Sequence, residues 1–149
     1  MLKRDYGGQN CSIARALEIV GERWTLLIVR DVFLGLRKFD ELQENLGIAR
    51  NVLTDRLNRL VEEGILERVR YSERPARYEY RLTPKGVELN VALTALRQWG
   101  DKHLSDKPPR LLRRKADRKP VVAALVPKGT AVLGPEEVET VPGPGSTAS

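Results

Sequence analysis

The chain has 149 residues, of which 26 are basic and 20 are acidic, giving a formal net charge of +6. This length suffices for one domain with its own core, and no apolar run approaches the ~20 residues of a membrane-spanning helix. A single cysteine, Cys11, excludes an internal disulfide, and with the single histidine, His103, it leaves no conventional zinc-ligand set. We therefore expect no metal and no other cofactor. Charged residues interrupt the N-terminal segment too often for a secretory signal, so we expect a cytoplasmic protein without a membrane partner.

The N-terminal third of the chain predicts a flexible arm followed by two short helices. Residues 1–10 are polar and contain glycine, which is typical of an arm. Ser12 is the expected N-cap of a first helix, and Gly21 is expected to end it. A second helix should stop at Gly35. Apolar residues recur at helical spacing in both: Ile13, Ala16, Leu17 and Val20, then Trp24, Leu27, Ile28 and Val32.

A helix–turn–helix pattern follows directly. Residues 39–46 and 50–63 each have an apolar stripe at helical spacing, and the sequence Gly-Ile-Ala at 47–49 separates them. Gly64 closes the second helix. The stripe residues are Phe39, Leu42 and Leu46 in the first helix and Leu53, Leu57, Leu60 and Val61 in the second.

Two basic strands come next, at 66–71 and 78–82, where side chains alternate with period two. The turn between them carries Arg74, Pro75 and Arg77. A hairpin beside a helix–turn–helix is the wing of a winged-helix domain, and arginines at its tip can hold phosphate or enter a minor groove. The alternative is a hairpin whose charges only protect an exposed edge.

The C-terminal part predicts one long helix and an extension. Thr83 should cap a helix with Pro84 at its first position, running to about His103. From Asp106 the composition changes, and residues 107–120 hold seven basic side chains against one acidic one. Two short apolar segments around residues 127–129 predict a hairpin, and the Pro- and Gly-rich end predicts disorder. The basic run is either a solvated linker or an arm that adds nonspecific affinity for DNA.

The second helix of the pair has a polar face opposite its leucines. Its N-terminal half is where a recognition helix meets base edges in the major groove. Asn51 could pair with adenine, Asp55 could accept from cytosine, and Thr54 could contact a thymine methyl. The alternative is a merely solvated face. The predicted DNA-contacting residues, with Arg56 and Arg59 on phosphates, are Arg50, Asn51, Thr54, Asp55, Arg56, Asn58, Arg59, Arg74 and Arg77.

These stretches resemble the HxlR family of bacterial winged-helix transcription regulators, which is related to the MarR group. The two most specific matches are GERWTLLI at residues 21–28 and NVLTDRL at residues 51–57. Further matches at family spacing, among them Arg30-Asp31 and Tyr78-Glu79-Tyr80, extend the resemblance over about residues 11–104.

The resemblance implies an α+β, mainly α fold. It places a winged helix-turn-helix domain with N- and C-terminal dimerisation helices at residues 11–105 and an extension at 106–149. It also implies a homodimer that binds a palindromic operator in double-stranded DNA. The first helix and the helix after Thr83 would pack across the two-fold axis through Ile13, Leu17, Leu89, Leu93, Leu96 and Trp99. The alternative is that this apolar seam packs wholly within one subunit.

Cys11 matches the N-terminal cysteine through which several family members sense oxidants or electrophiles. A helix start and nearby cations would favour its thiolate. The alternative is a small residue packed at the dimer interface. The extension is similar to those of some actinobacterial members, which often carry paired cysteines suggesting a metal site. This chain has none there, so no metal is carried over.

Together these features predict a homodimeric, sequence-specific transcription regulator at the nucleoid, more often a repressor than an activator. Two alternatives remain: a nonspecific nucleic-acid-binding protein and a winged-helix module for protein interaction. An enzyme is not expected, because His103 stands alone and no nucleophile–base arrangement is evident. A small-molecule effector could sit in the dimer crevice, although no residue set specifies one.

Overall fold

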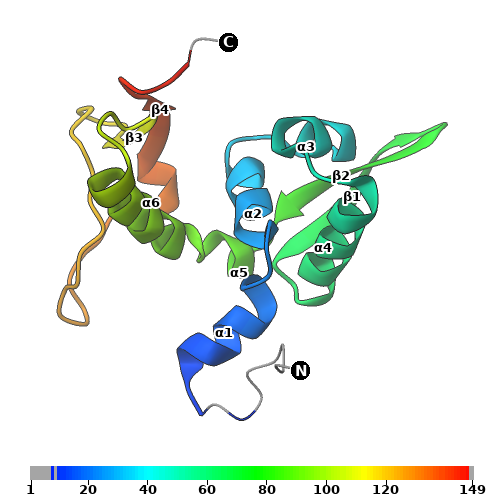
Figure 1. Cartoon of the computed structure of the whole chain (residues 1–149), viewed down its shortest axis with the longest axis horizontal. Coiled ribbons are helices and arrows are strands. Elements are labelled where there is room, and N and C mark those ends of the chain that lie inside the picture. The colour runs from blue at the N-terminus through cyan, green and yellow to red at the C-terminus, as the bar shows by residue number, and fades with distance from the viewer. Residues whose placement is uncertain (1–7, 9, 148–149) are drawn as a thin grey trace. The chain divides into compact units, whose positions relative to one another are not determined.

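The computed structural model describes residue 8 and residues 10–147 (Figure 1). The predicted arm at 1–10 therefore lies almost wholly outside the described residues. The chain forms two compact units, Met1–Val87 and Glu88–Ser149, which are described separately. Among the helices of the described residues, none has the length and apolar character needed to span a bilayer.

Two short helices open the first unit. Helix α1 spans Ser12–Val20 and α2 spans Thr25–Phe33. The predicted cap at Ser12 is wrong by one residue. Cys11 holds the N-cap position with an extended backbone, and its carbonyl accepts the Arg15 N–H at 3.0 Å. Ser12 is already helical, so its hydroxyl cannot serve as the N-cap. Gly21 ends α1 as predicted.

The helix–turn–helix is confirmed with nearly the predicted bounds. Helix α3 spans Phe39–Leu46 and α4 spans Arg50–Glu62. Gly47 ends α3 at φ +65°, a left-handed conformation that glycine adopts without strain. The core lies in this unit, where the buried apolar residues are Val20, Ile28, Val29, Val32, Leu42, Ile48, Leu53, Leu57, Leu60, Ile65 and Leu66.

The hairpin is longer than its two predicted strands. Strand β1 spans Leu66–Glu73 and pairs antiparallel with β2, Ala76–Leu82. Glu73 is opposite Ala76, so the turn contains only Arg74 and Pro75, joined by a cis peptide bond. The prediction that Arg77 belongs to the turn is wrong, because ladder pairing continues to the tip and places Arg77 in β2.

The predicted single helix from Pro84 to His103 is also wrong. Helix α5 covers only Pro84–Val87, and α6 begins anew at Asn90 and ends at Leu104. Thr83 caps α5 as predicted, since its Oγ1 accepts the Gly86 N–H at 3.1 Å. Gly86 is buried, and a Cβ there would lie 2.1 Å from the Ile65 carbonyl oxygen. This close packing requires glycine, a poor helix former, just before the break.

The second unit contains α6 and a hairpin that the sequence placed elsewhere. Strand β3, Arg110–Arg114, pairs antiparallel with β4, Val138–Pro142, which follows the 3₁₀ turn η1 at Pro135–Glu137. The prediction of a hairpin around residues 127–129 is wrong, because β3 finds its partner beyond this segment. The Pro- and Gly-rich end predicted to be disordered begins at Pro142, the last residue of β4. After it, the Gly143 and Gly145 N–H groups donate to the Pro109 and Pro108 carbonyls at 2.9 and 3.0 Å.

Candidate nucleic-acid interface

Helix α4 presents one buried and one exposed face. Leu53, Leu57 and Leu60 are fully buried. The polar residues predicted to read bases are all exposed: Asn51, Thr54, Asp55 and Asn58. The Thr54 hydroxyl donates to the Arg50 carbonyl at 2.9 Å, which engages its only proton and leaves its oxygen as an acceptor and its methyl group for recognition. At the start of the helix, the Arg50 guanidinium lies 4.7 Å from the centre of the Phe39 ring.

A buried carboxylate joins the two helices that precede α4. Asp31 of α2 is completely buried, and its Oδ2 accepts a hydrogen bond from Asn45 Nδ2 of α3 at 2.8 Å. Arg30 Nε donates to the other oxygen at 2.9 Å. A buried carboxylate with both oxygens satisfied fixes the orientation of its partners. Neither Asp31 nor Asn45 is among the site residues predicted from sequence, although a charged residue within an apolar helical stretch was the available signal.

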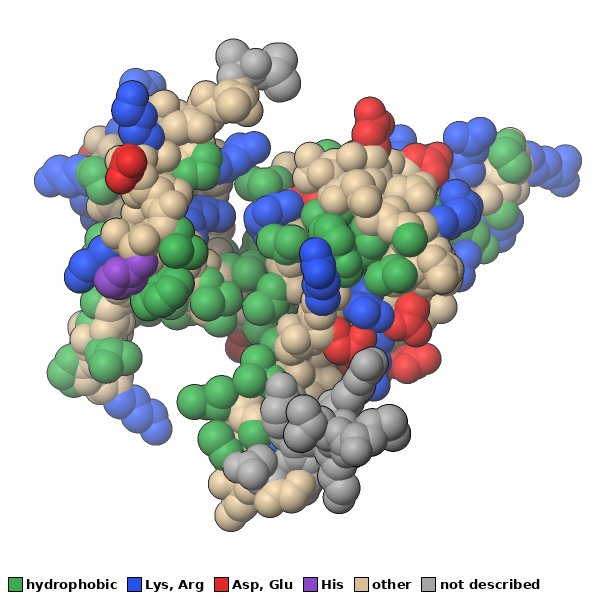
Figure 2. Space-filling view, viewed as in Figure 1, with side chains coloured by type: hydrophobic (Ala, Val, Ile, Leu, Met, Phe, Trp, Pro, Cys, Tyr) green, Lys and Arg blue, Asp and Glu red, His purple; other side chains and the backbone are tan. Residues whose placement is uncertain are grey.

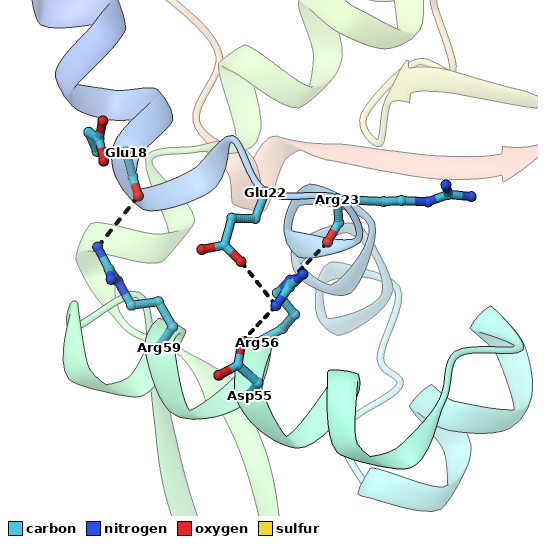
Figure 3. Close-up of polar contacts among 6 residues, drawn as sticks. All are labelled: Glu18, Glu22, Arg23, Asp55, Arg56 and Arg59. Carbon is cyan, nitrogen blue, oxygen red and sulfur yellow. Dashed lines mark hydrogen bonds and ion pairs between the residues drawn. The ribbon is translucent and has the colours of Figure 1, made fainter. Parts of the chain in front are cut away.

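Two arginines of α4 face the protein (Figure 3). Arg56 contacts the turn between α1 and α2: Nε donates to the Arg23 carbonyl at 3.0 Å, and Nη1 lies 2.9 Å from Glu22 Oε2. Arg59 Nη2 donates to the Glu18 carbonyl of α1 at 3.4 Å, and its Nε pairs with Glu63 at 3.2 Å. From the sequence, both guanidinium groups are predicted to contact DNA phosphates. In the structure, both instead have partners within the chain.

The hairpin contains both engaged and unengaged arginines. Arg68 stacks 3.8 Å from the Tyr78 ring centre, Arg70 pairs with Glu73 at 3.6 Å, and Arg81 pairs with Glu79. Among residues 8 and 10–147, by contrast, no side-chain hydrogen bond, ion pair or ring contact engages Arg74 or Arg77. Figure 2 shows basic side chains gathered at the far end of the hairpin. A phosphate could approach both cations there without displacing a protein partner.

The hairpin contacts the segment that leads into α3, and α5 contacts the end of α4. The Tyr80 N–H donates to the Arg37 carbonyl at 2.7 Å, and the Lys38 ammonium lies 4.9 Å from the Tyr71 ring centre. Lys85 Nζ donates to the Glu63 carbonyl at 2.7 Å, at the C-terminal end of α4. The exposed face of α4 and the hairpin are thus held in one unit, as a surface that contacts a groove and its flanking phosphates requires.

The remaining predicted residues are solvent-accessible. Cys11 is exposed at the start of α1. His103 is an exposed residue that lies 5.0 Å from the Trp99 ring centre. Of the residues predicted at a dimer interface, Ile13, Leu17, Leu96 and Trp99 are exposed, whereas Leu89 and Leu93 are half-buried. Across the described part of the chain, no three His, Cys, Asp or Glu side chains are grouped to hold a metal ion.

A helix–turn–helix with a two-stranded wing defines the winged-helix class. The family described as HxlR-like helix-turn-helix matches residues 19–108, and the chain belongs to this family. It is 54% identical over 104 residues to the uncharacterized HTH-type transcriptional regulator Rv3095 of Mycobacterium tuberculosis H37Rv. That match covers 68% of this chain and 66% of the relative, so the chain spans slightly less than two thirds of the relative's length.

Solved structures support the same fold. PA1607, whose assignment as a transcription factor is provisional, is 41% identical, with a TM-score of 0.72 over 80% of this chain and 85% of that chain. The transcriptional regulator YodB of Bacillus subtilis, in its reduced form, is 30% identical, with a TM-score of 0.55 over 64% and 96%. YodB has also been solved after diamide treatment. The predicted family and fold class are therefore confirmed.

Proposed function

We propose that this protein is a homodimeric, sequence-specific regulator of transcription that binds a palindromic operator in double-stranded DNA. The observation that carries the proposal is a surface of the first unit with two complementary parts. The exposed polar face of α4 has the side chains that read base edges, and the neighbouring hairpin tip has two arginines without protein partners. Such a pairing separates base readout from phosphate contact.

In this proposal α4 enters the major groove. Asn51 pairs with adenine, Asp55 accepts from the exocyclic amine of cytosine, and the Thr54 methyl contacts thymine. Asn58 and Arg50 lie beside these residues and contact the edges of the site. Arg74 and Arg77 hold phosphates or enter the adjacent minor groove. Arg56 and Arg59 are not counted among the phosphate contacts, because both already have partners within the chain.

The proposal of a homodimer is supported by the burial pattern of the second unit. None of its described residues, 88–147, is buried, and α6 has no buried side chain. A unit of this size without a core cannot offset the conformational entropy of its own folding. The apolar side chains assigned to the subunit contact are Ile13, Leu17, Leu89, Leu93, Leu96 and Trp99. Two α4 helices related by a two-fold axis would read the two halves of a palindrome.

Repression and an oxidant response through Cys11 are finer parts of the proposal. A dimer bound over a promoter blocks polymerase access, which favours repression. Cys11 is an exposed thiol. The structure of YodB, which is similar to this chain, has been solved both in its reduced form and after diamide treatment. Since the chain has no second cysteine, oxidation of Cys11 would produce an intersubunit disulfide, a mixed disulfide or a sulfenic acid.

The test is selection of duplexes from a random pool at near-physiological salt, with and without diamide. We expect an inverted repeat to be enriched by the reduced protein, with specific binding at least about 10³ times tighter than binding to bulk DNA. Asn51→Ala should cost roughly 1–3 kcal/mol on this repeat and nothing on scrambled DNA. Failure to enrich any motif would contradict the proposal and favour nonspecific binding or a protein-interaction module.

The diamide arm tests the thiol separately. Loss of the repeat under diamide, prevented by Cys11→Ser, would support an oxidant response. Enrichment of the same repeat under both conditions would retain the regulator and eliminate the thiol switch.

A further inference from the structure

Arg56 lies on the proposed recognition helix, yet its guanidinium is directed at the preceding turn (Figure 3). Its side chain is only 19% exposed. Nε donates to the Arg23 carbonyl at 3.0 Å, and Nη1 pairs with the Glu22 carboxylate at 2.9 Å. A guanidinium presents its donors in a rigid fork, so two such partners fix both its position and its plane.

The same guanidinium also holds a side chain of the exposed face of α4. Arg56 Nη1 donates to Asp55 Oδ2 at 2.6 Å, while the Asp55 side chain remains 71% exposed. Asp55 is thereby oriented by a group that is itself anchored to the turn between α1 and α2. Arg59 adds a second attachment of α4 nearby, through the Glu18 carbonyl at the end of α1.

An outward swing of Arg56 towards a phosphate would break all three contacts. It would leave the Glu22 carboxylate and the Arg23 carbonyl without this donor, and it would move a guanidinium that is only 19% exposed away from three partners at once. Arg74 and Arg77 can meet phosphates without such a loss. The contacts of Arg56 are therefore better suited to setting the geometry of the surface than to binding DNA directly.

We infer that Arg56 is a positioning residue that determines specificity: it fixes α4 against the turn between α1 and α2 and orients Asp55 for base readout. This inference rests on the proposed function, since it concerns the same surface. Base readout depends on hydrogen bonds with narrow geometry, whereas phosphate attraction tolerates small displacements. Loss of the anchor should therefore reduce discrimination between sequences more than it reduces overall attraction to DNA.

The test measures binding to the duplex selected by the wild-type protein and to a scrambled duplex of equal length, each across a range of salt concentrations. For Arg56→Lys we expect the specific-to-scrambled affinity ratio to fall by about tenfold, because an ammonium cannot reproduce the fork. Binding to the scrambled duplex and its salt dependence should remain unchanged. If Arg56 contacted phosphate, lysine would preserve the ratio, and Arg56→Gln would reduce the salt slope by about 0.9.

Glu22→Gln is a second variant, for which the positioning role and the phosphate-binding role of Arg56 predict opposite changes in DNA binding. If Arg56 positions α4, weakening its partner should lower the specificity ratio, and the effect should be less than additive with Arg56→Lys. If Arg56 binds phosphate, releasing it from Glu22 should instead strengthen binding to both duplexes. Arg77→Gln is the matched control at a proposed phosphate contact, where the salt slope should fall and the ratio should not.

The outcomes separate the inference from the proposed function. Failure of the wild-type protein to discriminate between duplexes would overturn the proposed function and this inference with it. Discrimination by the wild-type protein that is fully retained in Arg56→Lys and Glu22→Gln would overturn the inference alone. Circular dichroism of each variant establishes that a reduced ratio does not reflect unfolding.

Discussion

The arginines of the first unit fall into two groups: those whose guanidinium already contacts a group of the protein, and those whose guanidinium does not. Arg56 and Arg59 hold carbonyl and carboxylate groups of the chain, and Arg68 stacks on an aromatic ring. Arg74 and Arg77 have no such side-chain contact within the described residues. A cation without a protein partner can neutralise a phosphate and release its counterions without first breaking an ion pair. The hairpin tip is therefore the part of this surface best suited to sequence-independent attraction.

Replacing both Arg74 and Arg77 with alanine should weaken binding to every duplex. Each lost phosphate contact removes about 0.9 from the slope of log affinity against log salt, so the slope should flatten by up to about two units. Fluorescence anisotropy between about 50 and 200 mM salt measures this slope. Arg70→Ala is the matched control, because Arg70 is paired with Glu73 on the same hairpin. An unchanged slope in the double variant would eliminate the phosphate role.

At the scale of elements, local patterns predicted α3 and α4 almost to the residue. Helical apolar spacing and the glycines that end each helix are local signals, and the packing of Leu53, Leu57 and Leu60 agrees with them. The partner of β3 could not be predicted in the same way. It lies more than twenty residues further along the chain, and apolar alternation within a segment does not identify a distant partner.

The candidate site was likewise predictable only in part. Helical periodicity identified the exposed positions Asn51, Thr54, Asp55 and Asn58. It could not show that Arg56 folds back onto Glu22, because that contact depends on where the preceding turn lies in space. Side-chain direction on a helical wheel is known only relative to the helix itself.

An ion pair between Arg114 and Asp117 closes the short turn after β3. Arg114 donates to both carboxylate oxygens of Asp117, and Asp117 Oδ1 also accepts the Lys119 N–H at 3.1 Å. The hydrogen bond from Arg114 lowers the pKa of Asp117 below its ordinary value of 3.8, with the Lys119 N–H acting in the same direction and burial opposing it. The ionised form of Asp117 thus stabilises this turn.

The sign of the pH effect follows from this lowered pKa. Because the folded value lies below the ordinary value, the stabilisation is fully present above pH 3.8 and is lost as the pH falls through the folded pKa. Asp117→Asn should therefore lower the thermal midpoint at pH 7, and the difference from wild type should shrink under strongly acidic conditions. Thermal melts by circular dichroism across this range provide the measurement. Asp106→Asn, an exposed substitution in the same unit, is the control, and a pH-independent difference would contradict the ionic explanation.

At the scale of the whole molecule, the two units differ in what stabilises them. The first unit has a continuous set of buried aliphatic residues, whereas no described residue of 88–147 is buried. The exposed fractions of Leu96 and Trp99 on α6 are 55% and 58%. Apolar side chains this accessible on one helix are consistent with the subunit contact of the proposed homodimer. In the proposed homodimer a second copy of the chain would cover them, because each copy supplies the same surface to the other.

The double substitution Leu96→Glu and Trp99→Glu should therefore dissociate the proposed homodimer. Buried interface residues of this size each contribute on the order of 2 kcal/mol or more, so the dimer dissociation constant should rise by at least about a hundredfold. Analytical ultracentrifugation measures this constant, and Lys102→Glu serves as a charge-matched control on an exposed position of the same helix.

A monomer can place only one α4 on DNA, so the variant should bind a half-site as tightly as the full inverted repeat. A variant that stays dimeric, or a wild-type protein that is monomeric at micromolar concentration, would show that α6 is not the subunit contact. Retention of the full-repeat preference by a dissociated variant would instead mean that both half-sites are not read by paired subunits.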